Sequence, residues 1–331
     1  MNKSIRWGII GCGDVTERKS GPAFNLVPGS SLLAVMRRDA AKAEDYAKRH
    51  NVSKWYSDAG RLIADPDINA IYVATPPGAH EEYTIAALKA GKPVYVEKPM
   101  ATDTAACSRM LKTADETGVK LSIAHYRRAL PMFLYIKELL AAKAIGQPRT
   151  VRISLLQPPQ SELVASTQTN WRVDPAIAGA GLFYDLAPHQ LDLLIYFFGA
   201  PLGASGCSAN QAGLYKAEDV VTGWMRLPQD IMFTGQWCYT VAASLREDLF
   251  EITGSKGRIR FAVFDHSVTV ETENGVETKT FTPPQHIQQP MIEKVVEYFT
   301  GTGANPCSAA EALESMRVME QFAYGNAKPK S

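Results

Sequence analysis

A lysine between a glutamate and a proline stands where a buried strand should end. Lys98 follows the apolar run Val94–Val96 and lies between Glu97 and Pro99. In a parallel sheet the carboxyl ends of the strands border the ligand crevice, so a lysine at this point faces a ligand rather than the core. Its ammonium group can donate to a substrate oxygen, with Glu97 orienting it or contacting a cofactor. The alternative is an exposed cation that merely ends the strand.

An aspartate and a histidine form the second group suited to proton transfer. Asp185 and His189 would share one face of a helix, because residues four apart are neighbours on a helix surface. An imidazole titrates near neutrality, as a proton-transfer group must. We predict that this helix runs from about Asp185 to Phe198, which places Pro188 in its tolerant first turn and His189 near its N-terminus. A core histidine beside a capping aspartate is the alternative.

A glycine-rich stretch directly follows the first apolar strand. Gly11-Cys12-Gly13-Asp14-Val15 comes after the run Ile5–Ile10 and opens a helix. Glycines at such a junction let backbone amides approach a pyrophosphate, so these five residues are predicted to contact a dinucleotide. The third position of the usual pattern holds Thr16 instead of glycine or alanine. A tight turn without a ligand is therefore the alternative.

Two arginines stand where an NAD-binding sheet usually carries an acidic residue. Arg37 and Arg38 end the second predicted strand, and a guanidinium group grips a phosphate through two parallel hydrogen bonds. The sequence therefore favours NADP(H), with Arg37 as the main contact, while NAD(H) is possible. In the alternative reading both arginines are solvated, or Asp39 binds the ribose hydroxyls.

Several motifs in one order resemble the glucose-fructose oxidoreductase, inositol dehydrogenase and MocA family (Gfo/Idh/MocA). Besides the glycine loop they are Glu97-Lys98-Pro99, Ala74–His80, Trp171–Pro175 and Gly179–His189. The resemblance thus covers both halves of the chain. It implies a nicotinamide-dependent oxidoreductase of sugars, polyols and related hydroxy compounds, with a dinucleotide-binding domain followed by an α/β sheet domain.

The resemblance also implies roles for individual residues. Lys98, Asp185 and His189 would act together in proton transfer and substrate binding. The implied cofactor contacts outside the glycine loop and the arginines are Thr75, Pro76, Pro77, His80, Glu97, Lys98, Trp171 and Arg172. Tyr126 and Arg127 follow the sixth predicted strand, where the site should continue, and are predicted to bind substrate. Packing for Tyr126 and a solvated ion pair for Arg127 are equally open.

The elements that must position these residues differ between the two halves. Residues 1–125 alternate short apolar strands with helical segments, which predicts a doubly wound parallel sheet, the Rossmann fold. Residues 126–331 hold a helix, a second helix near Asp185, several strands joined by hairpin turns and two closing helices. This order of helices and strands predicts an α+β domain that has a mostly antiparallel open sheet and binds substrate. The closing helices could pack back on the first domain.

The predicted second sheet has more strands than its helices can cover. An uncovered sheet face tends to be buried by a partner, so we expect a homodimer or a higher homo-oligomer. The 331 residues carry 35 basic and 34 acidic side chains, so no excess of positive charge favours binding to nucleic acid or an anionic membrane. The five cysteines are widely spaced and form neither a disulfide framework nor a metal site, which fits the cytoplasm. No signal peptide or membrane span is indicated.

The sequence therefore predicts an NADP(H)-dependent oxidoreductase that moves a hydride between nicotinamide and a carbinol or carbonyl carbon of a small hydroxy compound. Lys98 and His189 would transfer the proton of the substrate hydroxyl group. Two other functions stay open. One is a nonoxidative enzyme that uses bound nicotinamide transiently, and the other is a catalytically silent sensor of the cofactor.

Overall fold

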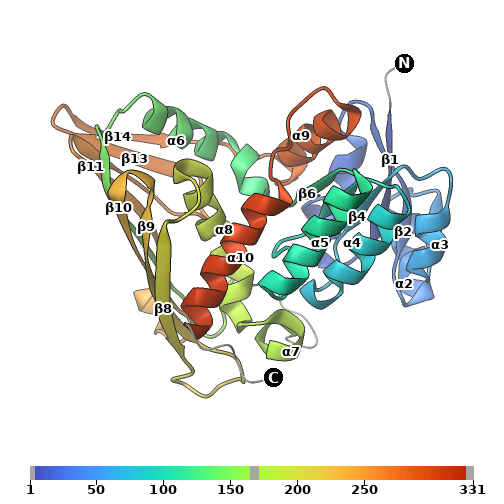
Figure 1. Ribbon diagram of the computed structural model, residues 1–331, viewed down its shortest axis with the longest axis horizontal. Helices are drawn as coiled ribbons and strands as arrows, with labels where there is room; N and C mark the ends of the chain where they lie inside the picture. The colour runs from blue at the N-terminus through green and yellow to red at the C-terminus, as the bar shows by residue number, and fades with distance from the viewer. Residues whose placement is uncertain (1–3, 165–170, 326–331) are drawn as a thin grey trace. The chain divides into compact units, whose positions relative to one another are not determined.

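A computed structural model of the chain describes residues 4–164 and 171–325 (Figure 1). The chain divides into two compact units. The first contains Met1–Leu130 and Pro284–Leu313, and the second contains Pro131–Pro283 and Glu314–Ser331. The chain thus leaves the first unit after Leu130 and returns to it at Pro284.

The first unit is built on a six-stranded sheet in which every neighbouring pair of strands is parallel. The strand order is β3-β2-β1-β4-β5-β6, which is the doubly wound order that the sequence predicted. The strands are β1 (Ile5–Ile10), β2 (Ser30–Met36), β3 (Lys54–Tyr56), β4 (Ala70–Val73), β5 (Val94–Val96) and β6 (Leu121–Ile123). The strands β4, β5 and β6 are buried at every position, as expected for a parallel sheet covered on both faces.

Helices follow the strands of this sheet in alternation. They are α1 (Asp14–Arg18), α2 (Ala40–Arg49), α3 (Ala59–Ala64), α4 (His80–Lys89) and α5 (Thr104–Thr117). Aspartates begin three of them: the carboxylates of Asp39, Asp58 and Asp103 accept the backbone N–H three residues further on. Such caps typically contribute about 1 kcal/mol each and fix where the helix starts.

The helix α9 (Gln289–Thr300) belongs to the first unit although it lies far along the chain. It contributes Phe299 to an aromatic cluster with Trp7, Phe24, Tyr72 and Tyr95. The ring centroids of Trp7 and Phe24 are 4.8 Å apart, and those of Tyr72 and Tyr95 are 5.2 Å apart. Each such pair contributes about 0.5–1.5 kcal/mol beyond its buried area. The cluster therefore anchors the returning segment on one face of the sheet.

The second unit is built on an eight-stranded sheet in the order β14-β13-β12-β11-β7-β10-β9-β8. Strands β7 and β10 pair in parallel, and the remaining pairs are antiparallel, which confirms the predicted mostly antiparallel open sheet. The strands are β7 (Pro148–Leu156), β8 (Gly203–Ala209), β9 (Val220–Leu227), β10 (Ile231–Cys238), β11 (Glu247–Gly254), β12 (Gly257–Phe261), β13 (Ser267–Thr272) and β14 (Gly275–Thr280).

Helices cover one face of this sheet. They are α6 (Pro131–Ala141), α8 (Gly181–Phe198) and the C-terminal part of α10 (Ala309–Tyr324); a short helix, α7 (Pro175–Ala178), precedes α8. The side chains of Phe133, Phe183 and Phe322 reach the sheet from α6, α8 and α10, where they contact Phe261, Trp237 and Phe233. This inner face is the core of the unit.

Three glycines in register let α10 approach the sheet closely. Gly206, Gly223 and Gly235 are paired across β8, β9 and β10. A Cβ atom on Gly223 would lie 2.4 Å from the ring of Phe322, and one on Gly206 would lie 2.7 Å from the Cα of the same residue. Larger residues would push the helix away, so the glycines fix the depth of packing.

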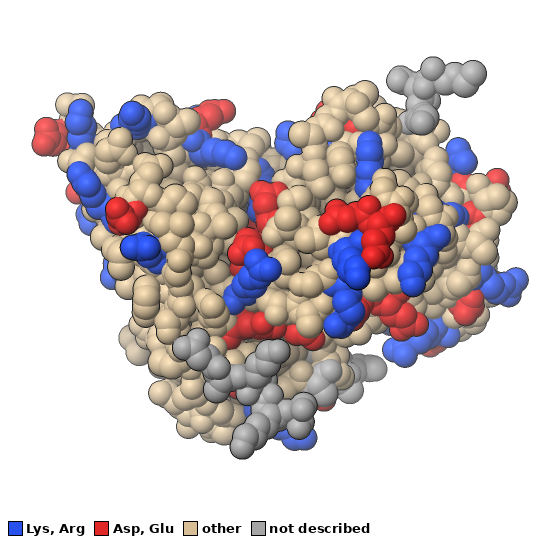
Figure 2. All heavy atoms as spheres, viewed as in Figure 1, with Lys and Arg blue, Asp and Glu red and all other residues tan. Residues whose placement is uncertain are grey.

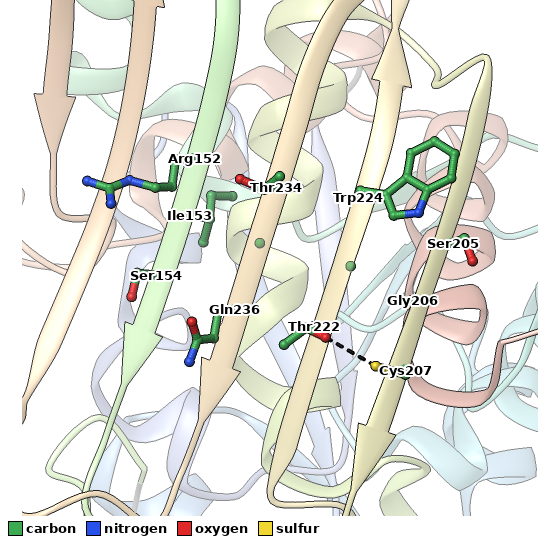
Figure 3. Close-up of a pocket in the computed structure, with 12 residues that line it drawn as sticks. Arg152, Ile153, Ser154, Ser205, Gly206, Cys207, Thr222, Trp224, Thr234 and Gln236 are labelled. Atoms are coloured by element: carbon green, nitrogen blue, oxygen red, sulfur yellow. Dashed lines mark hydrogen bonds between the residues drawn. The ribbon is translucent and has the colours of Figure 1, made fainter.

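The opposite face of the sheet is open. A groove of about 570 Å³ lies on it, across strands β7, β10, β9 and β8. Figure 3 shows the residues that line this groove. Most residues that line the groove are polar. The lining consists of Arg152, Ile153, Ser154, Ser205, Gly206, Cys207, Thr222, Gly223, Trp224, Thr234, Gly235 and Gln236. Trp224 is 48% exposed and Met232, nearby on β10, is 47% exposed. An exposed tryptophan on a bare sheet face is typical of a surface that receives a partner.

Charged side chains of both signs are interspersed on the face of the molecule drawn in Figure 2. Of the helices that the structure describes, none has the length and apolar character to span a membrane. Within the same residues, no cluster of three or more His, Cys, Asp or Glu side chains could hold a metal ion.

Candidate active site

The glycine loop lies between the ends of three strands in the first unit. The backbone N–H groups of Gly11 and Cys12 donate to the carbonyl oxygen of Met36 at the end of β2. Gly11 has a φ of +96°, and a Cβ on it would lie 2.8 Å from the backbone nitrogen of Thr75 after β4. Only glycine fits this position. A Cβ on Gly13, in contrast, would meet only the carbonyl oxygen of Gly11, at 4.0 Å, so the space above Gly13 is open.

Thr16 occupies the third position of the glycine pattern without disturbing the packing. Its buried hydroxyl donates to the carbonyl oxygen of Gly13 at 2.7 Å, and its own carbonyl oxygen accepts from the hydroxyl of Tyr46 at 2.8 Å. The threonine thus satisfies its polar group within the first turn of α1. The departure from glycine or alanine is therefore compatible with a dinucleotide loop.

The loop after β4 completes one side of this site. The hydroxyl oxygen of Thr75 is buried beside Gly11 and has no hydrogen-bond partner among the described residues. A buried hydroxyl without a partner costs about 1–3 kcal/mol, which a bound ligand can offset. Together with the two glycines, it fits the phosphates or ribose of a dinucleotide. Pro76 is exposed in this loop, whereas Pro77 is buried.

His80 is fully buried at the start of α4. Its Nε2 lies 2.7 Å from the carbonyl oxygen of Thr75, and its Nδ1 lies 3.0 Å from that of Pro99. Burial lowers the pKa of His80, so the imidazole is neutral and donates to one of these oxygens at a time. The side chain therefore joins the loop after β4 to the loop that carries Lys98.

Arg37 lies against the glycine loop. Its Nη1 donates to the carbonyl oxygen of Cys12 at 3.3 Å, and the residue is half-buried. Arg38 is exposed, and the carboxylate of Asp39 is engaged at the start of α2 with the backbone N–H and the ammonium group of Lys42. Arg37 is therefore the side chain at this strand end that best fits a phosphate near the loop.

Glu97 is buried next to Lys98 at the end of β5. Its Oε1 accepts from the hydroxyl of Tyr72 at 2.5 Å and from Nε2 of Gln288 at 2.7 Å. Its Oε2 accepts from the backbone N–H of Lys98 at 3.1 Å. Lys98 itself is half-buried. The sequence did not indicate Gln288, because it stands alone among residues without a motif.

Tyr126 and Arg127 lie in a short 3-10 helix, η3 (Tyr126–Ala129), that follows β6. Both are buried, and the guanidinium of Arg127 lies 5.5 Å from the ring centroid of Tyr126. Because all strands of this sheet are parallel, these residues share its carboxyl edge with Gly11, Thr75 and Lys98. The first unit thus places Tyr126 and Arg127, predicted to bind substrate, at the same edge as the predicted cofactor residues Gly11, Thr75 and Lys98.

The second unit places Asp185 and His189 on α8. This helix begins at Gly181, not near Asp185, so Pro188 lies in its interior and His189 lies in its middle. The predicted first-turn position of Pro188 and the predicted position of His189 near the helix N-terminus were therefore wrong. Gly181 has a φ of +60°, and a Cβ on it would lie 2.6 Å from the Cβ of Ala217. This glycine, which no helix propensity favours, sets the start of α8.

Arg172 holds Asp185 in place. Its Nε donates to Oδ2 of Asp185 at 3.1 Å, and the arginine is 7% exposed. The sequence predicted Arg172 as a cofactor contact, and in the structure its side chain contacts Asp185. The side chain of Trp171 lies outside the described part of the structure. His189 is 6% exposed, with its ring set edge to face against Phe264 at 5.6 Å between centroids.

Tyr239 is a further polar residue on this face that the sequence did not indicate. It continues the inward alternation of Phe233, Gly235 and Trp237 beyond the end of β10, on the side where α8 lies. Its hydroxyl is buried and has no hydrogen-bond partner among the described residues. Burial raises the pKa of Tyr239 well above its ordinary value, and the charge of Asp185 adds to the effect. The alternation of inward residues could have pointed to it.

Comparison with known proteins defines the class. A family model described as an oxidoreductase family with an NAD-binding Rossmann fold matches residues 5–125. A model of the GFO/IDH/MocA C-terminal domain matches residues 133–260. The chain therefore belongs to the Gfo/Idh/MocA family of NAD(P)-dependent oxidoreductases, as its motifs indicated. Gln288 lies beyond both matched stretches.

The relatives are similar over most of the chain. Oxidoreductase P35 of Formosa agariphila is 40% identical over 324 residues, which cover 97% of this chain and 99% of that protein. The 1,5-anhydro-D-fructose reductase of Ensifer adhaerens is 28% identical over 258 residues, 77% of this chain and 74% of that protein. The aldose-aldose oxidoreductase of Caulobacter crescentus, solved with glycerol, shares the fold, with a TM-score of 0.85, 22% identity and 96% coverage of both chains.

Proposed function

We propose that this enzyme transfers a hydride between NADP(H) and a carbinol or carbonyl carbon of a sugar, a polyol or a related small hydroxy compound. The observation that carries the proposal is the arrangement of Glu97 and Lys98 at the sheet edge that also holds the glycine loop and Thr75. Bound nicotinamide supplies the hydride acceptor or donor, and the protein supplies alignment and proton transfer.

Lys98, Asp185 and His189 are the proposed catalytic residues. In the oxidation direction, Lys98 and His189 hold the substrate hydroxyl, and His189 removes its proton directly or through Lys98. Asp185 orients the imidazole, and the hydrogen bond from Arg172 fixes the orientation of that carboxylate. In the reduction direction the same groups return the proton. Tyr126, Arg127 and Tyr239 are proposed to contact the substrate, because the first two follow β6 at the carboxyl edge of the first sheet and Tyr239 directly follows β10 of the second.

Arg37 is proposed to select NADP(H). Its guanidinium lies at the glycine loop, where it donates to the carbonyl oxygen of Cys12, and the carboxylate of Asp39 is engaged as a helix cap, so a 2′-phosphate has a cation to bind. Arg38 would add a weaker, solvent-exposed contact. The similarity to a 1,5-anhydro-D-fructose reductase supports a carbohydrate-like substrate.

Turnover of NADPH tests the proposal. A panel of aldoses, ketoses, dicarbonyls and polyols would be screened in both directions by absorbance of the reduced cofactor. We expect Lys98→Ala and His189→Ala to lower kcat by about 10²- to 10⁴-fold with little change in cofactor affinity. Lys89→Ala, at an exposed helix position, is the control for loss of a lysine. Near-parent activity in either active-site variant would remove that residue from the mechanism.

Two other functions stay as alternatives. A nonoxidative enzyme would form product with no net change in cofactor. A silent sensor would bind NADPH and ligand, detected by fluorescence quenching, without oxidising either. The combination of Lys98, Asp185 and His189 in one chain favours the oxidoreductase.

We also propose that the chain acts as a homodimer or higher homo-oligomer in the cytoplasm. The open sheet face with exposed Trp224 and Met232 supports the assembly, since a second copy would bury it. The five cysteines, all within the described residues, are free thiols, which suits a reducing compartment. Nucleic acid and membranes are not proposed as partners.

A further inference from the structure

The carboxyl group of Glu97 has three hydrogen-bond donors around it, although it is only 5% exposed. Tyr72 and Gln288 donate to Oε1 at 2.5 and 2.7 Å, and the backbone N–H of Lys98 donates to Oε2 at 3.1 Å. All three are donors, a set that suits a carboxylate rather than a carboxylic acid. Burying a charge is costly unless such partners are present, so Tyr72 and Gln288 are required for Glu97 to occupy this place.

Each of the two side-chain donors is itself held rigidly. Gln288 is 1% exposed, and its backbone N–H donates to the carbonyl oxygen of Lys19 at 3.1 Å. Its own carbonyl oxygen accepts from the backbone N–H groups of Met291 and Ile292, which start α9. Tyr72 is fully buried in the aromatic cluster and stacked on Tyr95. Neither donor can move without disturbing the core.

The network ends at the residue proposed to carry the proton. Glu97 directly precedes Lys98, and its Oε2 takes the backbone N–H of Lys98. A carboxylate fixed by Tyr72 and Gln288 therefore fixes the backbone at the end of β5, from which the Lys98 side chain extends. An apolar side chain would suit the surrounding aromatic cluster better, so stability alone does not explain a buried glutamate here.

We propose that Tyr72 and Gln288 are positioning residues that act on Lys98 through Glu97. This inference rests on the proposed role of Lys98 in proton transfer. A hydrogen bond to a charged group is typically equivalent to a 10- to 100-fold change in an equilibrium or rate. We expect Tyr72→Phe and Gln288→Leu each to lower kcat by about 10-fold or more, with the KM for substrate and the Kd for NADPH within about twofold of the parent.

Tyr95→Phe is the matched control. Tyr95 is as buried as Tyr72 and belongs to the same stack, but its hydroxyl makes one long contact, at 3.5 Å, with Oε1 of Gln288. Among the described residues it has no hydrogen bond to Glu97. Both substitutions remove a hydroxyl oxygen from the same stack, but Tyr72→Phe removes a 2.5 Å hydrogen bond to Glu97, whereas Tyr95→Phe removes the 3.5 Å contact with Gln288. Tyr95→Phe should keep kcat within about twofold of the parent.

A double-mutant cycle separates positioning from packing. In a Glu97→Gln background, Tyr72→Phe should have a much smaller effect on kcat, since the acceptor charge is already gone. Additive effects of Tyr72→Phe and Glu97→Gln would overturn the proposal.

Hydrogen exchange of the peptide that contains Lys98 tests the network without an activity assay. The backbone N–H of Lys98 should exchange faster in Tyr72→Phe and Gln288→Leu than in the parent or in Tyr95→Phe. Faster exchange with unchanged kcat, or equal exchange in Tyr72→Phe and Tyr95→Phe, would overturn the inference. If the parent turns over no member of the substrate panel, the proposed function fails, and the exchange comparison still decides whether Tyr72 and Gln288 hold the end of β5.

Discussion

Replacing Arg37 with aspartate should reverse the NADP(H) preference that we propose for this enzyme. The guanidinium of Arg37 lies at the glycine loop, with its Nη1 3.3 Å from the carbonyl oxygen of Cys12. In the parent it would donate to the 2′-phosphate of NADPH. A hydrogen bond of this charged type contributes about 1.5–3 kcal/mol, so its loss should weaken NADPH binding by roughly 10- to 100-fold.

The new aspartate should also strengthen the binding of NADH. A carboxylate at this strand end can accept from the adenine ribose hydroxyls of NADH, as in an ordinary NAD site. Because the position is half-exposed, we count such a hydrogen bond at the low value of about 0.5–1.5 kcal/mol, or roughly a 2- to 12-fold gain. The ratio of the two affinities should therefore change by at least about 20-fold. Repulsion between the carboxylate and the 2′-phosphate would increase this change in the affinity ratio. Solvent weakens the repulsion because the position is half-exposed.

Fluorescence titration or calorimetry with NADPH and NADH measures both affinities on the parent and on Arg37→Asp. Arg61→Asp is the control, because it makes the same change of charge at an exposed position on α3. It should leave both affinities within about twofold. Equal affinities of the parent for the two cofactors, a parent preference for NADH, or an unchanged NADPH affinity in Arg37→Asp would refute the role of Arg37.

Three other substitutions test other parts of the structure. Gly11→Ala should lower the free energy of unfolding by about 1–3 kcal/mol and abolish cofactor binding, because residue 11 has a φ of +96° and the new Cβ would lie 2.8 Å from the backbone nitrogen of Thr75. A denaturant titration that gives the parent's free energy of unfolding would contradict this. Trp224→Arg should dissociate the proposed oligomer in sedimentation experiments, and a monomeric parent at micromolar concentration would disprove the assembly. Hydrogen bonding from Arg49 lowers the pKa of Glu17 from 4.5 to about 2, so Glu17 stabilises the fold above pH 4.5 and loses this effect as the pH falls toward 2. Glu17→Gln should therefore lower the Tm at pH 7, with a difference that closes between pH 4.5 and 2.

Much of the first sheet could be predicted from the sequence because β4, β5 and β6 are buried on both faces. Each of these strands is a short run of mostly apolar residues, and the helices between the strands of the sheet show a clear change of period. The motif residues stand at strand ends, which places Gly11, Thr75 and Lys98 at one edge as soon as the strands are known to be parallel. No tertiary contact had to be foreseen for this part.

The second unit shows where such reasoning stops. The strand β8, Gly203–Ala209, consists of glycine, alanine, serine and cysteine and has no apolar alternation to reveal it. It forms because β9 supplies its hydrogen bonds and because Gly206 accepts the close approach of Phe322. The start of α8 was misjudged for a similar reason. Gly181 begins this helix because Ala217 leaves no room for a Cβ there, and that neighbour is 36 residues away in a loop.

The proposed reacting groups and the residues around them differ in how far the sequence reveals them. Lys98 and His189 could be proposed from short motifs, because the proposed chemistry depends on residue type and on a place near a strand end or on one helix face. The hydrogen bonds to the neighbouring carboxylates come from elsewhere: Gln288 donates to Glu97 across 191 residues of sequence, and Arg172 donates to Asp185 across 13. A hydrogen bond needs only one residue at the right place, so it leaves no periodic pattern. Relatives that share the Glu-Lys-Pro motif should therefore differ in turnover where the residue equivalent to Gln288 cannot donate, even though their motifs are identical.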